Sequence, residues 1–301
     1  MTKILFKPSS VKKLQRSSDG TIKLFFEGYH AVLIPQKQGK NTLCISSQVG
    51  CAMGCTFCYT AKMGFVRNLR VEEILLQVRA ALEVLNAKDV HTKDSPRTHY
   101  AHDVITSLVF MGMGEPLNNW ENVQKAMHEL NEDYSYPYKK ITISTSGVLP
   151  KMKEFLEFPF KPQLALSLHS PFQEIRDVLM PLCKQWRVED LVAFCNDYTK
   201  KRRESVMIEY VMIKGLTDRD EDVKALLSLG FTAPTNFNLI PLNGELQLRD
   251  TAYIRSDSQR ITQFAQALRV AGHKAFIRHT RGSDIDAACG MLEWSDCKSN
   301  L

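Results

Sequence analysis

Three cysteines stand within eight residues of this 301-residue chain, at Cys51, Cys55 and Cys58. Their spacing is C-x3-C-x2-C, and the aromatic residue Phe57 directly precedes the last of them. Cysteine thiolates hold iron–sulfur clusters, usually four thiolates to a four-iron cubane. A local group of three therefore leaves one iron without a protein ligand. An open metal position is where a substrate or cofactor binds and is activated.

Other interpretations of the trio are weaker. A structural zinc site prefers paired C-x2-C knuckles, and the sequence has no second pair. A disulfide framework is not expected in a chain of this length whose start lacks the apolar core of a signal peptide. Chance clustering of buried cysteines is the remaining alternative. We therefore interpret the trio as ligands of a [4Fe-4S] cluster. S-adenosylmethionine (SAM) carries an amine and a carboxylate that could chelate the open iron, so the motif predicts reductive cleavage of SAM to a radical.

The bulk composition is that of an ordinary globular protein. Apolar residues make up 44% of the chain, and no apolar run approaches the length of a membrane span. With 39 basic and 33 acidic residues the net charge is +6, which permits a polyanionic partner without requiring one. Eight cysteines suggest ligands and redox chemistry rather than disulfides. We expect a cytoplasmic protein that does not bind a membrane.

Strand and helix patterns alternate after the cysteine motif. We expect a small β extension over residues 1–42, a catalytic core over 43–292 and a tail over 293–301. Apolar residues at helical spacing predict a helix from Val71 to Leu85 capped by Asn68, followed by a polar loop from Asn86 to Asp103. Further strands are expected over 104–111, 140–144, 163–168, 206–212, 236–241 and 274–278, and further helices over 119–133, 188–200, 218–229 and 258–271. This alternation predicts an α/β fold with a parallel sheet and an active site at the carboxyl ends of its strands.

Longer segments around the motif carry a resemblance to a known family. They are Thr42–Cys51, Gly64–Leu69, Phe110–Asn118, Ile141–Gly147, Leu166–Pro171, Glu209–Met212, Asn238–Asn243 and Arg281–Gly290. In this order the chain resembles the radical SAM RNA methyltransferases that methylate a ring carbon of adenine. That family includes dual-specificity enzymes acting at C2 in ribosomal and transfer RNA, and resistance relatives acting at C8. The resemblance spans residues 42–292 and implies a partial (β/α)6 barrel that holds a [4Fe-4S] cluster and SAM.

The resemblance also implies the cofactor-binding residues. The motif cysteines would bind the cluster, and seven residues at or after strand ends would contact SAM. These seven are Gly114, Glu115, Ser144, Ser167, Leu168, His169 and Asn243. Their chemistry agrees, because glycines let the backbone approach a ligand closely and a carboxylate can bind a ligand ammonium group. An ordinary glycine-rich turn is the alternative for residues 112–115.

Two further cysteines match catalytic positions of the family. Adenine ring carbons are poor nucleophiles, whereas a thiolate can take a methyl group from SAM first. The resemblance implies that Cys289 is methylated in this way, and that a radical made from a second SAM turns its methyl group into a carbon radical that adds to the ring. Cys44 would then break the protein–RNA thioether by forming a disulfide. Without the resemblance, Cys44 would be a small core residue. Cys195 is expected in the core, and Cys183 and Cys297 have no motif around them.

The chain departs from the family in two respects. Family members typically carry an N-terminal helical domain of about a hundred residues that helps to hold RNA, and this sequence starts close to the β extension. The family's general base is a glutamate in that extension, and alignment puts His30 or Ala31 at its position, with Glu27 off register. A histidine can act as a base near neutral pH. We therefore expect His30 to be the base, with Glu27 or no base in this segment as alternatives.

The function predicted from the sequence is methylation of an adenine ring carbon in RNA, at C2 rather than C8, through a methyl-cysteine. The expected partners are ribosomal or transfer RNA and a reducing protein such as flavodoxin or ferredoxin. One alternative keeps this chemistry but acts on another RNA or on a non-RNA substrate. A second alternative, a noncatalytic RNA-binding paralogue, conflicts with the intact cluster and catalytic cysteines.

Overall fold

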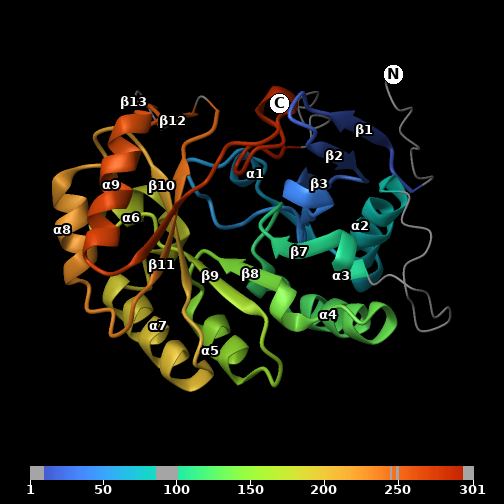
Figure 1. Cartoon of the computed structure of the whole chain (residues 1–301), viewed down its shortest axis with the longest axis horizontal. Coiled ribbons are helices and arrows are strands. Elements are labelled where there is room, and N and C mark those ends of the chain that lie inside the picture. The colour runs from blue at the N-terminus through green and yellow to red at the C-terminus, as the bar shows by residue number, and fades with distance from the viewer. Residues whose placement is uncertain (1–9, 86–100, 245, 249–250, 294–301) are drawn as a thin grey trace.

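The computed structural model describes residues 10–85, 101–244, 246–248 and 251–293. Within these residues ten strands form one sheet, in the order β1-β2-β3-β4-β7-β8-β9-β10-β11-β14 (Figure 1). The strands are β1 Lys13–Arg16, β2 Ile22–Phe25, β3 His30–Pro35, β4 Asn41–Cys44, β7 Ile105–Phe110, β8 Ile141–Thr145, β9 Gln163–Ser167, β10 Met207–Met212, β11 Asn236–Pro241 and β14 Lys274–Ile277.

The sheet changes character at β4. Strands β1 to β4 pair antiparallel, whereas every neighbouring pair from β4 to β14 is parallel. The predicted boundary between residues 42 and 43 falls inside β4, which belongs to both parts. The β extension is therefore continuous with the core sheet, and the parallel part begins with the strand that leads into the cysteine motif.

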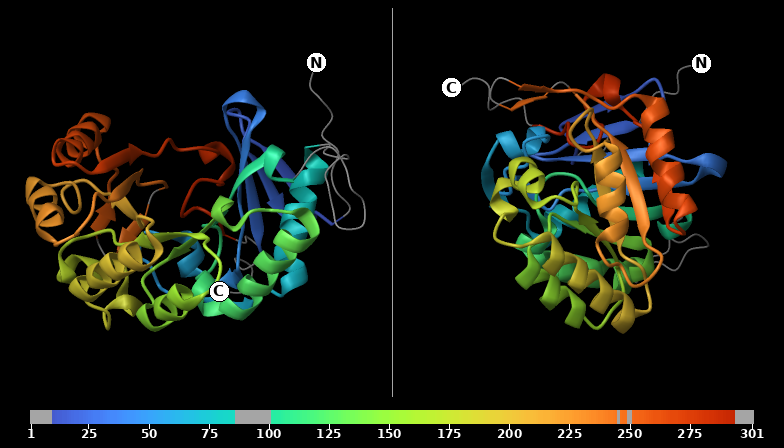
Figure 2. Two further views of the ribbon diagram at one scale, coloured as in Figure 1. Left: turned by 60° about the horizontal axis from the view of Figure 1, so that its bottom comes forward. Right: turned by 90° about the vertical axis from the view of Figure 1, so that its left-hand side faces the viewer.

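Helices cover the outer side of the curved sheet, and the C-terminal segment after β14 lies in its concave interior (Figure 2). The helices are α1 Tyr59–Lys62, α2 Val71–Val84, α3 Ala101–Val104, α4 Trp120–Tyr134, α5 Leu149–Glu157, α6 Gln173–Leu179, α7 Val188–Arg202, α8 Asp220–Ser228 and α9 Ser258–Val270. Two hairpins lie outside the ten-stranded sheet, β5 Gln48–Gly50 with β6 Phe65–Asn68 and β12 Leu246–Leu248 with β13 Thr251–Tyr253. None of the described helices is long and apolar enough to cross a bilayer.

The predicted parallel α/β architecture is confirmed, with local corrections. Asn68 does not cap α2, which begins at Val71; its side chain instead accepts a hydrogen bond from Gln48 across the β5–β6 hairpin (2.8 Å). The helices α5 and α6, with 9 and 7 residues, were not predicted. Of the loop predicted over 86–103, residues 86–100 lie outside the described part of the chain, and α3 begins at Ala101. Cys297 and the tail beyond residue 293 also lie outside it.

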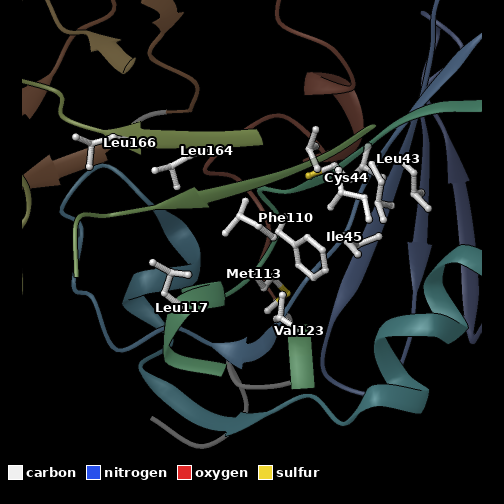
Figure 3. Packing of buried hydrophobic residues seen from close by; sticks show 14 of the residues in the cluster. Leu43, Cys44, Ile45, Phe110, Met113, Leu117, Val123, Leu164 and Leu166 are labelled. Carbon is white, nitrogen blue, oxygen red and sulfur yellow. The ribbon is translucent and has the colours of Figure 1, made fainter. Parts of the chain in front are cut away.

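The core packs against the outer face of β4 and its neighbours (Figure 3). Leu43 and Ile45 are completely buried there together with Phe110. Because successive side chains of a strand point to opposite faces, burial of residues 43 and 45 against the helices turns Thr42 and Cys44 toward the concave side. The alternation of side chains along β4 is therefore enough to place the Cys44 thiol on the concave face of the sheet.

Gln77 of α2 fastens the segment between Cys44 and the cysteine motif, and its loss should weaken the fold. It is fully buried; its Oε1 accepts from the backbone N–H of Ser46 (2.8 Å) and its Nε2 donates to the carbonyl of Ser46 (3.0 Å).

Gln77→Leu would leave both backbone groups buried without partners. Since each costs about 1–3 kcal/mol, we expect the free energy of unfolding to fall by about 2–5 kcal/mol, measured by urea titration of the apoprotein. Gln266→Leu on the exposed face of α9 is the control, and equal midpoints for the two variants would contradict the role of Gln77.

Candidate active site

Two adjoining cavities open where the parallel strands end. The first, of about 150 Å³, is lined by the loops that follow the strands, and we name it the strand-end cavity. The second, of about 420 Å³, extends along the concave face past Thr142 and Asn238, and we name it the inner-face cavity. Glu209, Arg278 and Cys289 line both cavities. The two spaces therefore share one wall of charged and nucleophilic side chains.

The three motif cysteines all line the strand-end cavity as free thiols. The cysteines lie in the loop that joins β5 to β6. A Cβ at Gly50 would lie 1.9 Å from the Gly64 carbonyl oxygen, so only glycine fits where the two hairpin strands meet. Burial raises the pKa of all three thiols, and for Cys55 the neighbouring Cys58 and Cys51 raise it further. Such closely grouped thiols release their protons when a metal centre binds.

The thiol trio fits an iron–sulfur cluster better than a single ion. Among the described residues, no three or more His, Cys, Asp or Glu side chains are grouped so as to hold one metal ion. A four-iron cubane gives each thiolate a different iron. Its ligands therefore surround a volume, as the cavity-lining cysteines do, and need not converge on one point.

Six of the seven predicted SAM contacts line the strand-end cavity. They are Gly114, Glu115, Ser144, Ser167, His169 and Asn243. Leu168 is the exception: its side chain is completely buried in the core, and its backbone N–H donates to the carbonyl of Glu209 (3.1 Å). Asn243 also supports the loop that carries Cys289, because its Nδ2 donates to the Cys289 carbonyl (3.2 Å).

The glycine-rich turn after β7 serves a purpose that the sequence did not reveal. A Cβ at Gly112 would lie 2.7 Å from Ser46 Oγ, and one at Gly114 would lie 2.5 Å from Gln48 Cβ. The close approach that these glycines permit is thus to the protein segment before the cysteine motif. Their backbone still lines the cavity, so the turn brings two walls of the site together.

Glu115 ties the ends of two neighbouring strands together. It is 3% exposed; Oε1 accepts from the N–H of Leu117 (3.1 Å), and Oε2 accepts from the N–H and the hydroxyl of Ser146 (2.8 and 2.7 Å). Burial raises the pKa of this carboxyl, while the bonds from Ser146 oppose the rise. Both oxygens therefore already have protein partners, although the residue remains in the cavity wall.

His169 is held as a neutral ring in an unusual backbone conformation. Its φ of 62° is in the left-handed region that non-glycine residues rarely occupy, and such strain tends to gather at functional sites. Burial, with the charge of Arg176, lowers the pKa of His169 to about 3. Its Nδ1 accepts from the N–H of Val211 (3.1 Å), so the ring carries its proton on Nε2. The residue can act as a hydrogen-bond donor but not as a cation.

Cys44 and Cys289 are free thiols that line the same inner-face cavity. Burial raises the pKa of Cys44 to about 12, the neighbouring Cys289 adds to the rise, and the guanidinium of Arg278 opposes it. Cys289 is exposed and lines both cavities; desolvation by the surrounding protein raises its pKa, Arg278 opposes the rise and Glu209 adds to it. Both thiols therefore line the inner-face cavity and are influenced by the guanidinium of Arg278.

The loop that carries Cys289 is fastened from two sides. The N–H of Tyr59, next to the cysteine motif, donates to the Gly290 carbonyl (2.8 Å). From the β extension, Asp19 Oδ2 accepts from the N–H of Gly282 (2.9 Å). Both ends of the loop are thus tied to segments more than two hundred residues earlier in the chain, and the β extension helps to position Cys289.

Neither His30, the predicted base, nor its alternative Glu27 lines either cavity. His30 is 1% exposed and its Nε2 lies 2.9 Å from the carbonyl of Glu293, so the C-terminal segment covers it. Burial, with the charge of Lys23, lowers the pKa of His30 to about 4. Glu27 extends into solvent and pairs with Lys12. The geometry therefore brings neither predicted base to the reacting groups.

Glu209 and Cys183 are among the site residues that the sequence patterns did not indicate. Glu209 is a charged residue inside the otherwise apolar strand β10, and that anomaly was the available signal. Cys183, which has no motif around it, is buried beside the cluster cysteines and helps to raise the pKa of Cys55. No local pattern marks Cys183, because it reaches the site only through the turn after α6.

Comparisons with known proteins agree with this arrangement. Residues 98–227 match the radical SAM superfamily. The dual-specificity RNA methyltransferase RlmN of Psychrobacter arcticus is 40% identical over 304 residues, which cover 95% of this chain and 72% of the relative. The chain belongs to the RlmN family. A radical SAM methyltransferase from Sphaerobacter thermophilus, 36% identical, matches with a TM-score of 0.82 over 94% of this chain and 80% of its own. A spore photoproduct lyase variant, 11% identical with a TM-score of 0.51 over 82% of this chain and 78% of its own, shares the fold alone.

Membership of the RlmN family decides the chemical class. The protein is a SAM-dependent radical methyltransferase that uses a [4Fe-4S] cluster and SAM, as the sequence predicted. The α/β radical SAM fold is likewise confirmed. The alternative of a noncatalytic RNA-binding paralogue is not supported.

The assignment of the cluster ligands can be tested by iron content. After anaerobic reconstitution the protein is expected to bind about four irons and four sulfides per chain. Replacing Cys51, Cys55 or Cys58 with alanine should abolish the brown chromophore and leave almost no iron, because the cubane loses one of its three anchors. Cys195→Ala, which alters a buried core thiol of α7, is the matched control and should retain iron. Full iron content in any of the three motif variants would refute the assignment.

Proposed function

We propose that this protein methylates a ring carbon of adenine in RNA, at C2 in preference to C8, through a methylated Cys289. The observation that carries the proposal is that Cys289 lines both the cavity of the cluster cysteines and the larger inner-face cavity. A thiol in this shared wall can take a methyl group on one side and deliver a carbon to a substrate on the other.

The inner-face cavity has properties that suit a nucleobase. Its volume of about 420 Å³ lies in the range of pockets that enclose small ligands. Its lining includes the polar side chains of Thr142, Gln163 and Asn238, which can bond to base edges. Enzymes that act on a base turn it out of its stack into such a pocket. The net charge of +6 is compatible with RNA as the polymer that presents the base, and the name of the Psychrobacter relative describes an RNA methyltransferase.

The chain's own residues would divide the work as follows. Cys51, Cys55 and Cys58 would hold the cluster, and the turn at Gly114 with Ser144, Ser167 and His169 would surround SAM. When bound, these two cofactors supply the methyl group and a 5′-deoxyadenosyl radical. His169 would contribute the Nε2–H donor, because its Nδ1 is already engaged. A reducing protein such as flavodoxin or ferredoxin would provide the electron.

Arg278 would favour the reactive form of both catalytic thiols. A guanidinium keeps its charge under all relevant conditions, and this one opposes the effect of burial on the pKa of Cys289 and of Cys44. The Cys289 thiolate would then accept the first methyl group. In the closing step the Cys44 thiolate would attack the Cys289 sulfur, so that an S–S bond forms and the bond from that sulfur to the RNA-linked carbon breaks. That carbon would keep the electron pair and take up a proton to become the methyl group. The unpaired electron left on the RNA by the radical addition would pass to a one-electron acceptor such as the oxidised cluster.

The reaction product gives the decisive test. Reconstituted protein, SAM and dithionite should convert unmodified ribosomal or transfer RNA to RNA that contains 2-methyladenosine, measured by mass spectrometry of the digested nucleosides. Cys289→Ala should retain its iron and form no product, because the methyl group has no acceptor, whereas Cys195→Ala should remain active. Detection of 8-methyladenosine would move the position to C8, and absence of any methylated adenosine would refute the proposal.

The roles of Cys44 and Cys289 can be separated in a second test. Cys44→Ala should still methylate Cys289, seen as one added methylene unit on the peptide that contains it. It should then stall with RNA joined covalently to Cys289, because no second thiol remains to break the thioether. The stalled species should survive a denaturing gel and disappear on ribonuclease treatment. The double variant Cys44→Ala, Cys289→Ala should trap no RNA. Free turnover by Cys44→Ala would show that Cys44 has only a structural role.

A further inference from the structure

Among the described residues, the shared wall of the two cavities contains one buried side-chain acceptor without a hydrogen-bond partner. Among the described residues that line the cavities, the carboxylates are Glu115 and Glu209. Both oxygens of Glu115 accept hydrogen bonds from protein. Glu209 is 2% exposed; its Oε2 accepts from Asn238 Nδ2 (2.7 Å), but its Oε1 has no hydrogen-bond partner. Since a buried acceptor left unpaired costs about 1–3 kcal/mol, Oε1 is expected to have a function.

Strand alternation directs Glu209 toward the reacting groups. It lies in the middle of β10, where Ile208 and Tyr210 are fully buried on the opposite face and the Tyr210 ring packs against Phe264 (5.5 Å between centroids). Glu209 faces the cavities, as does Val211 two residues on. The Glu209 carboxylate is close enough to Cys289 to raise the pKa of that thiol.

The proposed reaction requires a proton acceptor at this place. Methylation of a ring carbon replaces a C–H bond with a C–C bond, so the ring hydrogen has to leave as a proton after the new bond has formed. A carbon-bound proton does not exchange readily with water, and a positioned base is therefore needed. Because the new carbon is attached to the Cys289 sulfur during this step, the base has to lie beside Cys289. His30 and Glu27 do not line the cavities.

We propose that Glu209 is the general base that removes the ring proton, an inference that rests on the proposed function. The ring C–H bond breaks, its electron pair stays in the ring, and an O–H bond forms on Oε1. No electron enters or leaves in this step, and the carboxylate becomes a neutral carboxylic acid. Asn238 is a positioning residue, because it occupies Oε2 and leaves Oε1 to accept the proton.

The surroundings of Glu209 suit this role. Burial raises the pKa of its carboxyl above the ordinary value, and the charge of Arg278 and the bond from Asn238 oppose the rise. A carboxylate with a raised pKa takes up a proton more readily than an exposed one. Arg278 also lines both cavities, so a cation remains nearby while Glu209 is ionised.

Glu209→Gln tests the assignment, because it keeps the size of the side chain and removes the base. With SAM, dithionite and unmodified ribosomal or transfer RNA, it is expected to bind iron, cleave SAM and methylate Cys289 as the wild type does. Release of methyladenosine should fall by ~10²–10⁴-fold, and RNA joined to Cys289 should accumulate on a denaturing gel. Glu83→Gln is the matched control: this exposed glutamate of α2 lines neither cavity, and the variant should form product at the wild-type rate.

A second variant separates the base from a structural role. Glu209→Asp keeps a carboxylate that is one methylene shorter, and it should release more methyladenosine than Glu209→Gln. Wild-type turnover by Glu209→Gln would overturn the assignment and leave the proposed function standing. Loss of iron or of Cys289 methylation in both variants would overturn it in favour of a structural role. If the wild type itself formed no methylated adenosine, the proposed function would fail, and the assignment of Glu209 with it.

Discussion

The segment between Cys44 and Cys51 is held in place by buried side-chain hydrogen bonds, and both thiol sites depend on it. Ser46 is central: its hydroxyl donates to the carbonyl of His30 (2.6 Å) and accepts from the N–H of Met113 (2.9 Å), while Gln77 binds its backbone from the other side. One short stretch of chain thus joins the β extension, the helix α2 and the turn after β7. Since a buried polar group left unpaired is costly, these bonds specify one path for the chain. That path determines where the cluster cysteines and Cys44 lie.

The glycines of the turn after β7 also help to hold the segment between Cys44 and Cys51 in place. They remove the side chains that would collide with Ser46 and Gln48, so the turn can lie directly on this segment. Gln48 then accepts from the N–H of Glu115 (2.8 Å), and Glu115 reaches across to Ser146 at the end of β8. The ends of β4, β7 and β8 are in this way bound together by side chains, in addition to the ladder of the sheet. Rigid support of this kind keeps reacting groups within a narrow range of positions.

The guanidinium of Arg278 acts on all three acidic groups of the shared wall. Burial raises the pKa of Cys44, Cys289 and Glu209, and Arg278 opposes the rise in each case. If all three groups were ionised at once, one guanidinium would face three negative charges in a medium of low dielectric constant, which is unfavourable. The groups are therefore expected to ionise in turn. That expectation agrees with a reaction in which Cys289, Glu209 and Cys44 act in successive steps.

The amino-acid sequence by itself determined the elements whose signals are local. Strand β11 lies where it was predicted, over Asn236–Pro241, and the other core strands agree to within two residues, because apolar runs and strand ends can be read from neighbouring residues. The spacing of the cysteine motif likewise indicated three thiols facing one space.

The tertiary structure decided the positions of the other site residues. His30 looked like a base until Glu293, 263 residues later, covered its ring. Glu209 became a candidate only because one of its oxygens has no hydrogen-bond partner and the residue lines the same cavities as Cys289. Such roles depend on which distant segments meet and on which donors are already taken, and a sequence pattern records neither.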